Sequence, residues 1–282
     1  MVVGKVKTGR CFLYLKYFII ISLSALVLRL KHFGNRDVQC SGDDAIFDFI
    51  QNPEVSKRDN FGVLFQTVLH KSGKTSGNFL EIGGGSGKFF DHNMNVFGHL
   101  IANYVIIEPY TLISKDSKRN TEFENEIHKW KTRMKSTLYQ TNITVIEDFS
   151  TKTEVINSFR DSYFDFVYID GDHSYKGAKS DLKNYYSKVK RGGVIAGHDY
   201  CCSLEEYKDI LHAPWCGRYI YPHSTSNKLK DGKNKASWCG IFKGAEEFAK
   251  EHNFYWLYTL EGRNGLDAAG RDNPSYFTFK RE

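Results

Sequence analysis

The sequence lacks the features that mark repeat, low-complexity and nucleic-acid-binding proteins. Its 282 residues contain no fixed-period repeat and no low-complexity tract. No arginine-rich block is present, and the net charge of +6 arises from 39 basic residues scattered among 33 acidic ones. We therefore expect no nucleic-acid partner. The hydrophobic content of 41% suffices for one good-sized core, so one main domain with extensions is expected.

The six cysteines do not form a zinc-binding pattern. No Cys-x-x-Cys pair occurs, which gives a structural zinc site little support. Four cysteines cluster between residues 201 and 239, and one or two disulfides are expected there if the compartment is oxidising, with the pairing left open. The single glycosylation sequon, at 142–144, agrees with such a compartment.

A long uninterrupted apolar run is also missing. The N-terminal apolar segment at 11–30 is broken by Lys16, and it reaches the ~20 residues of a membrane span only if that lysine extends to the interface. We interpret it as a signal anchor. A cleaved signal peptide is the first alternative, although 28–31 offers no small-residue cleavage site, and a buried N-terminal helix is the second.

The segments predict a simple domain organisation. We expect a short tail at 1–10, a transmembrane anchor at 11–30, a stem and helical lead-in at 31–75, and the main domain at 76–282. Basic residues lie on both sides of the anchor and orient it only weakly. With the N-terminus inside, the protein is a single-pass membrane protein whose C-terminal domain lies in the secretory lumen; with the segment cleaved, it is secreted.

From residue 78 onward, short apolar runs alternate with helical stretches. This alternation indicates a doubly wound α/β domain whose mostly parallel sheet is covered on both faces. The strand candidates are 78–82, 104–107, 144–146, 164–169 and 193–196. Helices are expected at 45–50, 61–70, 175–190 and 245–250, the third ended by the glycines at 192 and 193. Strand-like runs at 254–260 and 276–280 predict an antiparallel hairpin at the end of the sheet.

The first strand candidate ends in a glycine turn. Residues 79–87 read Phe-Leu-Glu-Ile-Gly-Gly-Gly-Ser-Gly. Gly83 and Gly85 allow positive φ and a close approach of backbone to a ligand, and the residues from 86 onward present helix N-terminal amides to it. Glu81 is expected to accept hydrogen bonds from the ligand's hydroxyls or amine. The alternative is a surface turn with spare glycines.

Two further acids follow strand candidates. Glu108 ends the run 104–107, 27 residues after Glu81, and an acid at this place suits a ribose diol. Asp148 follows the run 144–146 and is a candidate acceptor for an adenine amino group. The alternative for both is a solvated acid at the end of a strand.

Two neighbouring strand ends carry both Asp and His. Asp170 and His173 follow 164–169, and His198 and Asp199 follow 193–196. Asp170, His198 and Asp199 make a candidate site for Mg²⁺ or Mn²⁺. His173 is a candidate base for a substrate hydroxyl, because its reference pKa lies near neutrality. Each histidine on its own is more often a surface or capping residue.

These motifs together resemble class I S-adenosylmethionine-dependent methyltransferases. The glycine turn at 79–87, Glu108, residues 169–175 (Ile-Asp-Gly-Asp-His-Ser-Tyr) and residues 197–200 (Gly-His-Asp-Tyr) carry the resemblance, which covers about 78–200. Within that class the chain is similar to small-molecule O-methyltransferases of the macrocin and catechol type, the branch with a methyltransferase-24-like domain. The resemblance implies a Rossmann-like seven-stranded sheet with a reversed last strand.

The resemblance also implies roles for single residues. The methionine part of the cofactor is then held by Glu81, Gly83, Gly85 and Gly87, the ribose by Glu108 and the adenine by Asp148. Asp170 and Asp199 become metal ligands, and His173 the candidate base. Catechol-type relatives have Asp-Asn where this chain has Asp199-Tyr200, so Tyr200 is not expected to be a ligand. Residues 201–240 match no known pattern and are expected to form a lid over the substrate.

The sequence thus predicts an S-adenosylmethionine-dependent methyltransferase acting on a hydroxyl of a small molecule or glycan, either with or without assistance from Mg²⁺ or Mn²⁺. One alternative is a catalytically inactive binding protein that keeps the nucleotide fold. Another is a nicotinamide-dependent oxidoreductase, because a glycine turn followed by an acid also suits NAD. The oligomeric state is left open.

Overall fold

The computed structural model describes residues 42–52, 55–109, 128, 141–200, 240–259 and 274–281. The predicted anchor, all six cysteines and residues 201–239 of the expected lid lie outside these ranges. Within them, no helix combines the length and apolar character needed to cross a membrane.

The described strands form one seven-stranded sheet in the order β3-β2-β1-β4-β5-β7-β6. The strands β1 to β5 pair in parallel, and β7 pairs antiparallel with both β5 and β6. The predicted mostly parallel sheet with a reversed last strand is therefore confirmed. The strand bounds are β1 (Gly77–Ile82), β2 (Ile101–Ile107), β3 (Asn142–Ile146), β4 (Phe164–Ile169), β5 (Val189–Gly197), β6 (Leu257–Tyr258) and β7 (Tyr276–Phe279).

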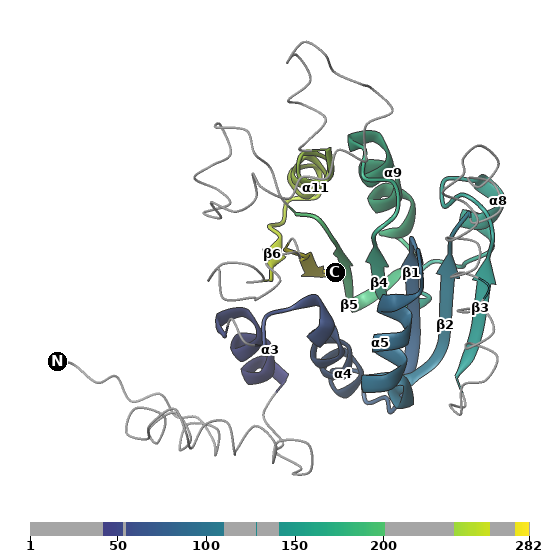
Figure 1. The fold of residues 1–282 in the computed structure, drawn as a ribbon. Coiled ribbons are helices and arrows are strands. Elements are labelled where there is room, and N and C mark those ends of the chain that lie inside the picture. The colour runs from purple at the N-terminus through teal and green to yellow at the C-terminus, as the bar shows by residue number, and fades with distance from the viewer. Residues whose placement is uncertain are drawn as a thin grey trace, which may run out of the picture.

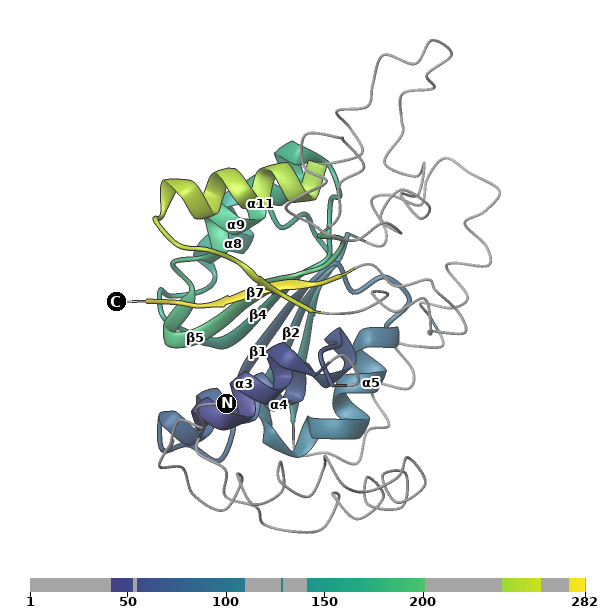
Figure 2. The same ribbon diagram turned by 90° about the vertical axis from the view of Figure 1, so that its left-hand side faces the viewer.

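Helices cover both faces of the sheet, which gives three layers (Figures 1 and 2). On one face lie α3 (Gly42–Gln51), the 3-10 turn η2 (Arg58–Asn60), α4 (Phe61–Lys71), α5 (Lys88–Phe97) and the 3-10 turn η3 (Gly98–Leu100). On the other lie α8 (Thr153–Asn157), α9 (Tyr175–Tyr185) and α11 (Gly240–Glu251).

The alternation of side chains along β1 builds both layers of the core. Phe79 stacks on Phe166 of β4, with ring centroids 4.8 Å apart, in the cluster beneath α4 and α5. Leu80 points to the opposite face and joins the cluster beneath α8, α9 and α11. Both side chains are fully buried, and each such burial stabilises the fold by about 1.5–3 kcal/mol.

The boundary between α9 and β5 differs from the sequence prediction. The helix predicted over 175–190 ends at Tyr185, and β5 begins at Val189 and continues through the two glycines that were expected to stop the helix. The reason is pairing with β4: the amides of Tyr163 and Phe164 both donate to the carbonyl of Lys188, and Phe164 lies opposite Val189. The partner strand, which local sequence does not show, decides this boundary.

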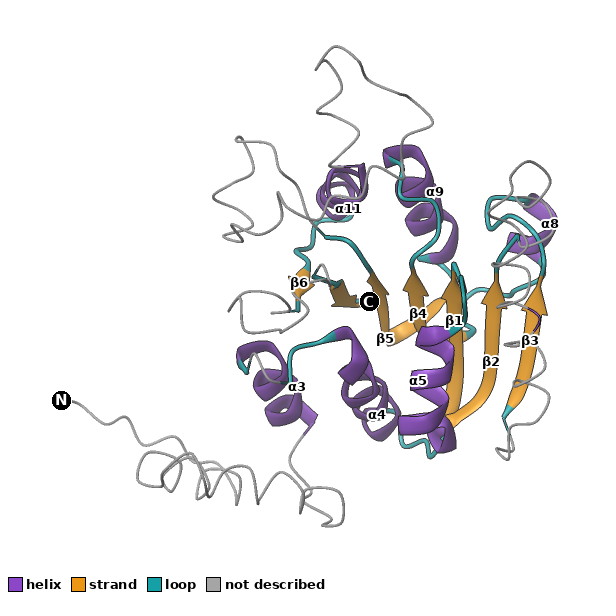
Figure 3. Cartoon of the chain, in the orientation of Figure 1, coloured by secondary structure: helices purple, strands orange, loops and turns teal. Residues whose placement is uncertain are grey.

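The register of the sheet brings four strand ends to one level. Ile82 lies opposite both Ile107 and Ile169, and Ile169 lies opposite Gly197. The residues that follow these strands therefore emerge side by side at the carboxyl edge, the edge toward which the arrowheads of β1, β2 and β4 point in Figure 3. Ligands bind at this edge in open α/β sheets.

Candidate active site

The glycine turn after β1 combines a packed glycine with an open one. Gly83 has a φ of 89°, and a Cβ there would lie 2.0 Å from the carbonyl oxygen of Asp170. Gly85 has a φ of 46°, and a Cβ there would meet nothing within 4 Å. Gly87, with a φ of 78°, is the N-cap of α5. Gly83 thus allows β1 and β4 to approach, while Gly85 leaves room for a ligand.

Glu108 lies beside that room. Its Oε2 accepts a hydrogen bond from the Gly85 amide at 3.0 Å, so the end of β2 is joined to the glycine turn. The residue is only 9% exposed, and burial raises the pKa of its carboxyl, although the Gly85 hydrogen bond opposes the shift. Glu108, which the sequence analysis proposed as a ribose-binding acid, therefore lies next to the glycine turn.

Glu81 lies deeper than a ligand-binding carboxylate at the open edge. It is 1% exposed, and its Oε2 accepts a hydrogen bond from the Tyr104 hydroxyl at 2.6 Å. That hydroxyl accepts one in turn from Nδ2 of Asn93 at 2.9 Å. Burial raises the pKa of Glu81 to about 8. Sequence reasoning missed Tyr104 and Asn93, because a β2 tyrosine and an α5 asparagine carry no local signal of this contact.

Asp148 follows β3 and is turned toward the adjacent helix. Its Oδ2 pairs with Lys152 at 2.7 Å, and its Oδ1 accepts from the amide of Phe149 at 2.7 Å. The hydrogen bond from Lys152 is the main cause that lowers the pKa of Asp148. Phe149 is 44% exposed, which leaves an aromatic ring beside this acid for stacking.

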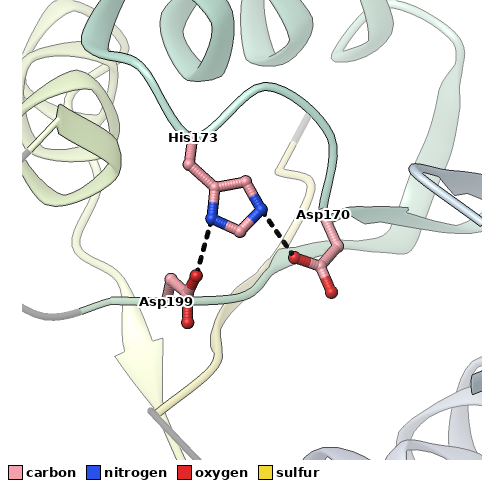
Figure 4. Close-up of side chains that lie close together, drawn as sticks. All are labelled: Asp170, His173 and Asp199. Atoms are coloured by element: carbon pink, nitrogen blue, oxygen red, sulfur yellow. Dashed lines mark ion pairs between the residues drawn. The ribbon is translucent and has the colours of Figure 1, made fainter. Parts of the chain in front are cut away.

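Asp170, His173 and Asp199 converge at the ends of β4 and β5 (Figure 4). His173 Nδ1 lies 2.8 Å from Oδ2 of Asp199, and its Nε2 lies 3.5 Å from Oδ1 of Asp170. His198 is close as well, with Nδ1 3.3 Å from Oδ1 of Asp199 and 3.6 Å from Oδ2 of Asp170. The structure therefore brings together the four Asp and His residues that the sequence proposed.

The donor set of this cluster fits a divalent cation. One ligand atom each from Asp170, His173 and Asp199 lie within 4.8 Å of one another. Two carboxylates and an imidazole suit Mn²⁺ or a softer ion better than Mg²⁺. The sequence had put His198 in the ligand set and His173 outside it; the geometry groups His173 with the two aspartates and leaves His198 beside them.

The imidazole of His173 lies between two carboxylates. The hydrogen bond to Asp199 raises the pKa of His173, and the charges of Asp170 and Asp199 add to the rise, against the opposing effect of burial. The backbone of Asp199 adopts a φ of 55°, an uncommon conformation for a residue with a side chain. Such strain is found where the surrounding structure fixes a functional side chain.

Arg58 is a site residue that sequence reasoning missed. It begins the 3-10 turn before α4, and its Nη1 lies 3.8 Å from Oδ2 of Asp170. Its charge also lowers the pKa of Glu81 slightly against burial, so it lies near the base of the glycine turn. The segment 31–75 was expected only to pack on the domain, and nothing in its sequence marks one arginine among several basic residues.

Tyr200 is directed away from the cluster, as expected. Its hydroxyl donates to a carboxylate oxygen of Glu246 on α11, and its ring is 3% exposed between Phe242 and Tyr276. Tyr200 therefore packs in the core on the face of the sheet that α11 covers.

The strand order, the glycine turn at the end of β1 and the acid at the end of β2 define the Rossmann-like fold of class I methyltransferases. Residues 80–200 match the family model described as a methyltransferase domain. This match confirms the resemblance to class I S-adenosylmethionine-dependent methyltransferases over that segment.

Solved structures with a similar fold include proteins of different descriptions. A protein from Corynebacterium glutamicum aligns at 10% identity over 92% of this chain and 98% of its own, with a TM-score of 0.46. The CurJ carbon methyltransferase aligns at 11% identity over 83% and 57%, with a TM-score of 0.49. An O-methyltransferase family protein from Burkholderia thailandensis aligns at 10% over 83% and 62%, with a TM-score of 0.43. A comparison with curated proteins gave no match.

The described residues fit the cofactor that this domain implies, S-adenosylmethionine. The space at Gly85 admits a ligand against the backbone, and the carboxylate of Glu108 stands beside it for a ribose diol. The Asp and His cluster follows β4, the strand next to β1, so an acceptor bound there would adjoin the methionine end of the cofactor.

Proposed function

We propose that the protein transfers a methyl group from S-adenosylmethionine to a hydroxyl of a small molecule or a sugar. The observation that carries the proposal is the pairing of His173 with Asp199, 2.8 Å apart, at the same sheet edge as the open glycine turn. A hydroxyl must lose its proton on methylation, and a histidine oriented by a carboxylate is suited to take it.

The cofactor-binding residues each act by a plain physical effect. The open space at Gly85 lets a ligand approach the backbone of the turn, and Glu108, whose Oε2 also accepts from the Gly85 amide, accepts hydrogen bonds from the ribose. Glu81 contributes mainly by holding the turn from below through Tyr104. Asp148 and the exposed ring of Phe149 are the candidates for the adenine end. Bound S-adenosylmethionine supplies an electrophilic methyl group on a sulfonium.

On the acceptor side, His173 receives the hydroxyl proton at Nε2, because Nδ1 lies 2.8 Å from Asp199 whereas Asp170 is 3.5 Å from Nε2, beyond the usual length of a hydrogen bond. Asp199 fixes the tautomer and stabilises the imidazolium that results. Placing the hydroxyl and the base in contact lowers the entropic part of the barrier.

A metal-assisted version uses the same residues differently. Asp170, His173 and Asp199 would hold the ion, which would acidify a coordinated hydroxyl. His173 then serves as a ligand, and His198, 3.3 Å from Asp199, is the nearest remaining imidazole. The two versions therefore make opposite predictions about chelation.

The test is incubation of the purified protein with labelled methyl donor and a panel of phenols and glycans, with EDTA or with added Mn²⁺ or Mg²⁺. His173→Ala should lower turnover about 10²–10⁴-fold on the preferred acceptor. His70→Ala, an exposed histidine of α4, is the matched control and should leave turnover unchanged. Loss of activity in EDTA supports the metal-assisted version, and full activity in EDTA supports the metal-free one.

Other outcomes of the test would overturn the proposal. Methylation of an acceptor nitrogen or carbon would refute hydroxyl transfer. Binding of the donor without transfer to any acceptor would favour a catalytically inactive binding protein. Binding of NAD instead of S-adenosylmethionine would favour a nicotinamide-dependent oxidoreductase.

A further inference from the structure

We propose that Arg58 binds the carboxylate of the cofactor's amino-acid tail and so makes the site select S-adenosyl compounds that retain this tail. The inference rests on the proposed function, because it assigns a residue to the cofactor. It adds a specificity-determining residue from the helical lead-in, outside the matched segment 80–200.

The position of Arg58 follows from two observations. Its Nη1 lies 3.8 Å from Oδ2 of Asp170, a distance of an ion pair rather than a hydrogen bond. The backbone carbonyl of Asp170 abuts Gly83, where an added Cβ would lie 2.0 Å from it. Arg58 therefore contacts the same residue, Asp170, that packs against the start of the glycine turn, and its side chain is 24% exposed.

The turn that carries Arg58 is fixed on both sides. His92 of α5 contacts the carbonyl of Asp59 with its Nε2 at 2.7 Å, and Nδ2 of Asn60 donates to the carbonyl of Val55 at 2.8 Å. A guanidinium on a fixed backbone loses less conformational entropy on binding than one on a free loop.

The charges around the turn call for a cation at this place. Asp170 and Glu108 are the charged acids beside it, because Glu81 is buried with a pKa of about 8, and the charge of Asp170 adds to the raised pKa values of both glutamates. An amino-acid tail is a zwitterion: its ammonium suits the acids, and its carboxylate needs a positive partner. Arg58 supplies a planar guanidinium, whose donors match a carboxylate in pairs.

Lys88 is the rival cation. It is the first residue of α5, directly after Gly87, and it is exposed to solvent. A flexible ammonium at an exposed helix start gives a weaker and less directional contact than an arginine that is three-quarters buried. Lys88→Ala therefore belongs in the test as the competing assignment.

The test compares two ligands by calorimetry on the full chain. S-adenosylhomocysteine carries the amino-acid tail, and 5′-methylthioadenosine has the same adenosine and thioether without it. Arg58→Met should weaken S-adenosylhomocysteine about 10–100-fold and leave methylthioadenosine unchanged, since a hydrogen bond to a charged group is lost only with the first. Arg58→Lys should recover part of the loss. Arg160→Met, before β4 at the opposite edge and over the ring of Tyr163, is the matched control.

Each other result overturns the assignment. An equal loss for both ligands in Arg58→Met would mean that Arg58 shapes the pocket, and no loss would mean that it does not touch the tail. A tail-specific loss in Lys88→Ala instead would move the role to Lys88. Wild-type protein that binds neither ligand would overturn the proposed function together with this inference, whereas tight wild-type binding with an unselective Arg58→Met would overturn the inference alone. The melting temperature of Arg58→Met, measured alongside, confirms that the variant is folded.

Discussion

Gly83 and Gly85 lie in the same turn, but the atoms around them differ, so their structural roles differ. A methyl group at Gly83 would overlap the backbone of Asp170, which has no freedom to move away because it continues β4. A methyl group at Gly85 would project into open space. Both positions have positive φ, which by itself costs a residue with a side chain about 1–2 kcal/mol.

Two alanine variants distinguish the packing role of Gly83 from the ligand-binding role of Gly85. Gly83→Ala should lower the free energy of unfolding by well over the ~2 kcal/mol of the conformational strain, because the clash is with backbone. Gly85→Ala should cost only that strain but should sharply weaken binding of S-adenosylhomocysteine. Urea denaturation and calorimetry on both variants check this. Equal stability of the two variants would contradict the assignment of Gly83 to packing.

Asp181 is a buried carboxyl that the sequence did not single out. It lies on α9 with 1% exposure, and its Oδ1 accepts from the Ser150 hydroxyl at 2.6 Å. Burial raises the pKa of Asp181 to about 6, whereas the unfolded chain has the ordinary value of 3.8. The folded protein therefore binds the proton more tightly, and stability falls as the pH rises from 3.8 through about 6.

Asp181→Asn should remove this dependence. Between pH 5 and pH 8 the wild type should lose about 1 kcal/mol more of its free energy of unfolding than the variant does. The amide keeps an acceptor for Ser150, so the variant should be at least as stable as the wild type at pH 8. Urea titrations at the two pH values test this, and parallel pH dependence in both proteins would refute it.

At the scale of elements, β4 is fixed at its start by a buried ion network. Asp165 is 1% exposed, with Oδ1 2.9 Å from Lys74 and Oδ2 2.6 Å from Lys190. Its Oδ2 also accepts from the amide of Asn78 at 2.9 Å. One carboxylate thus joins the lead into β1 and the start of β5 to β4, at the edge opposite the candidate site.

Asp165→Asn should lower the free energy of unfolding by about 2–4 kcal/mol, because it leaves two lysines without their counter-charge. The loss should be smaller than for a fully buried ion pair, because both lysines reach solvent. Burial raises the pKa of Asp165, but the hydrogen bonds from Lys190 and Lys74 outweigh it and lower the pKa overall. The contribution is therefore present at neutral pH and is lost as the pH falls through that lowered pKa.

The matched control is Asp161→Asn. Asp161 also pairs with a lysine, Lys188 at 2.8 Å, but its side chain is 68% exposed. Its loss should be much smaller, because solvent screens the pair. Thermal melts of both variants distinguish buried from exposed pairing, and equal shifts would contradict the role of Asp165.

At the scale of the whole molecule, the first described helix, α3, packs against the last strand, β7. The rings of Phe49 in α3 and Phe277 in β7 lie 5.6 Å apart, and Phe61 packs on Phe166 of β4 with centroids 5.6 Å apart. All four rings are fully buried. The helical lead-in predicted within 31–75 therefore supplies part of the core from α3 onward, and we expect the folding unit to include it.

Truncation tests this boundary. A chain of residues 42–282 should fold, whereas a chain of residues 76–282 should aggregate, because it exposes the apolar face that α3 and α4 cover. Circular dichroism and size-exclusion chromatography decide between the two. A soluble, folded 76–282 chain would contradict the placement of α4 in the core.

We further propose that residues 11–30 anchor the protein in a membrane, with the domain in the secretory lumen. Asn142 of the glycosylation sequon starts the edge strand β3 and is exposed. The full chain, expressed in a eukaryotic cell, should therefore pellet with membranes and lose mass on endoglycosidase treatment, and Asn142→Gln should abolish that loss. A full chain that stays in the soluble cytosolic fraction would refute the proposal.

The sequence by itself determined the class of fold and the edge that carries the site. Short apolar runs, the glycines at 83 and 85, and acids at the strand ends are local signals, and parallel strands bring their carboxyl ends to one edge whatever the details of packing. The residues Glu108, Asp170, His173 and Asp199 were all found in this way. The O-methyl acceptor, the metal and the anchor remain predictions.

Only the tertiary structure decided which residues meet. The end of α9 depends on pairing between β4 and β5. The buried position of Glu81 depends on its hydrogen bond with Tyr104, and the position of Arg58 depends on how η2 lies against Asp170. Each is a contact between segments far apart in the chain, and its free energy comes from a partner that no local pattern specifies. The glycine turn makes the same point, because one backbone conformation serves packing at Gly83 and leaves room for a ligand at Gly85.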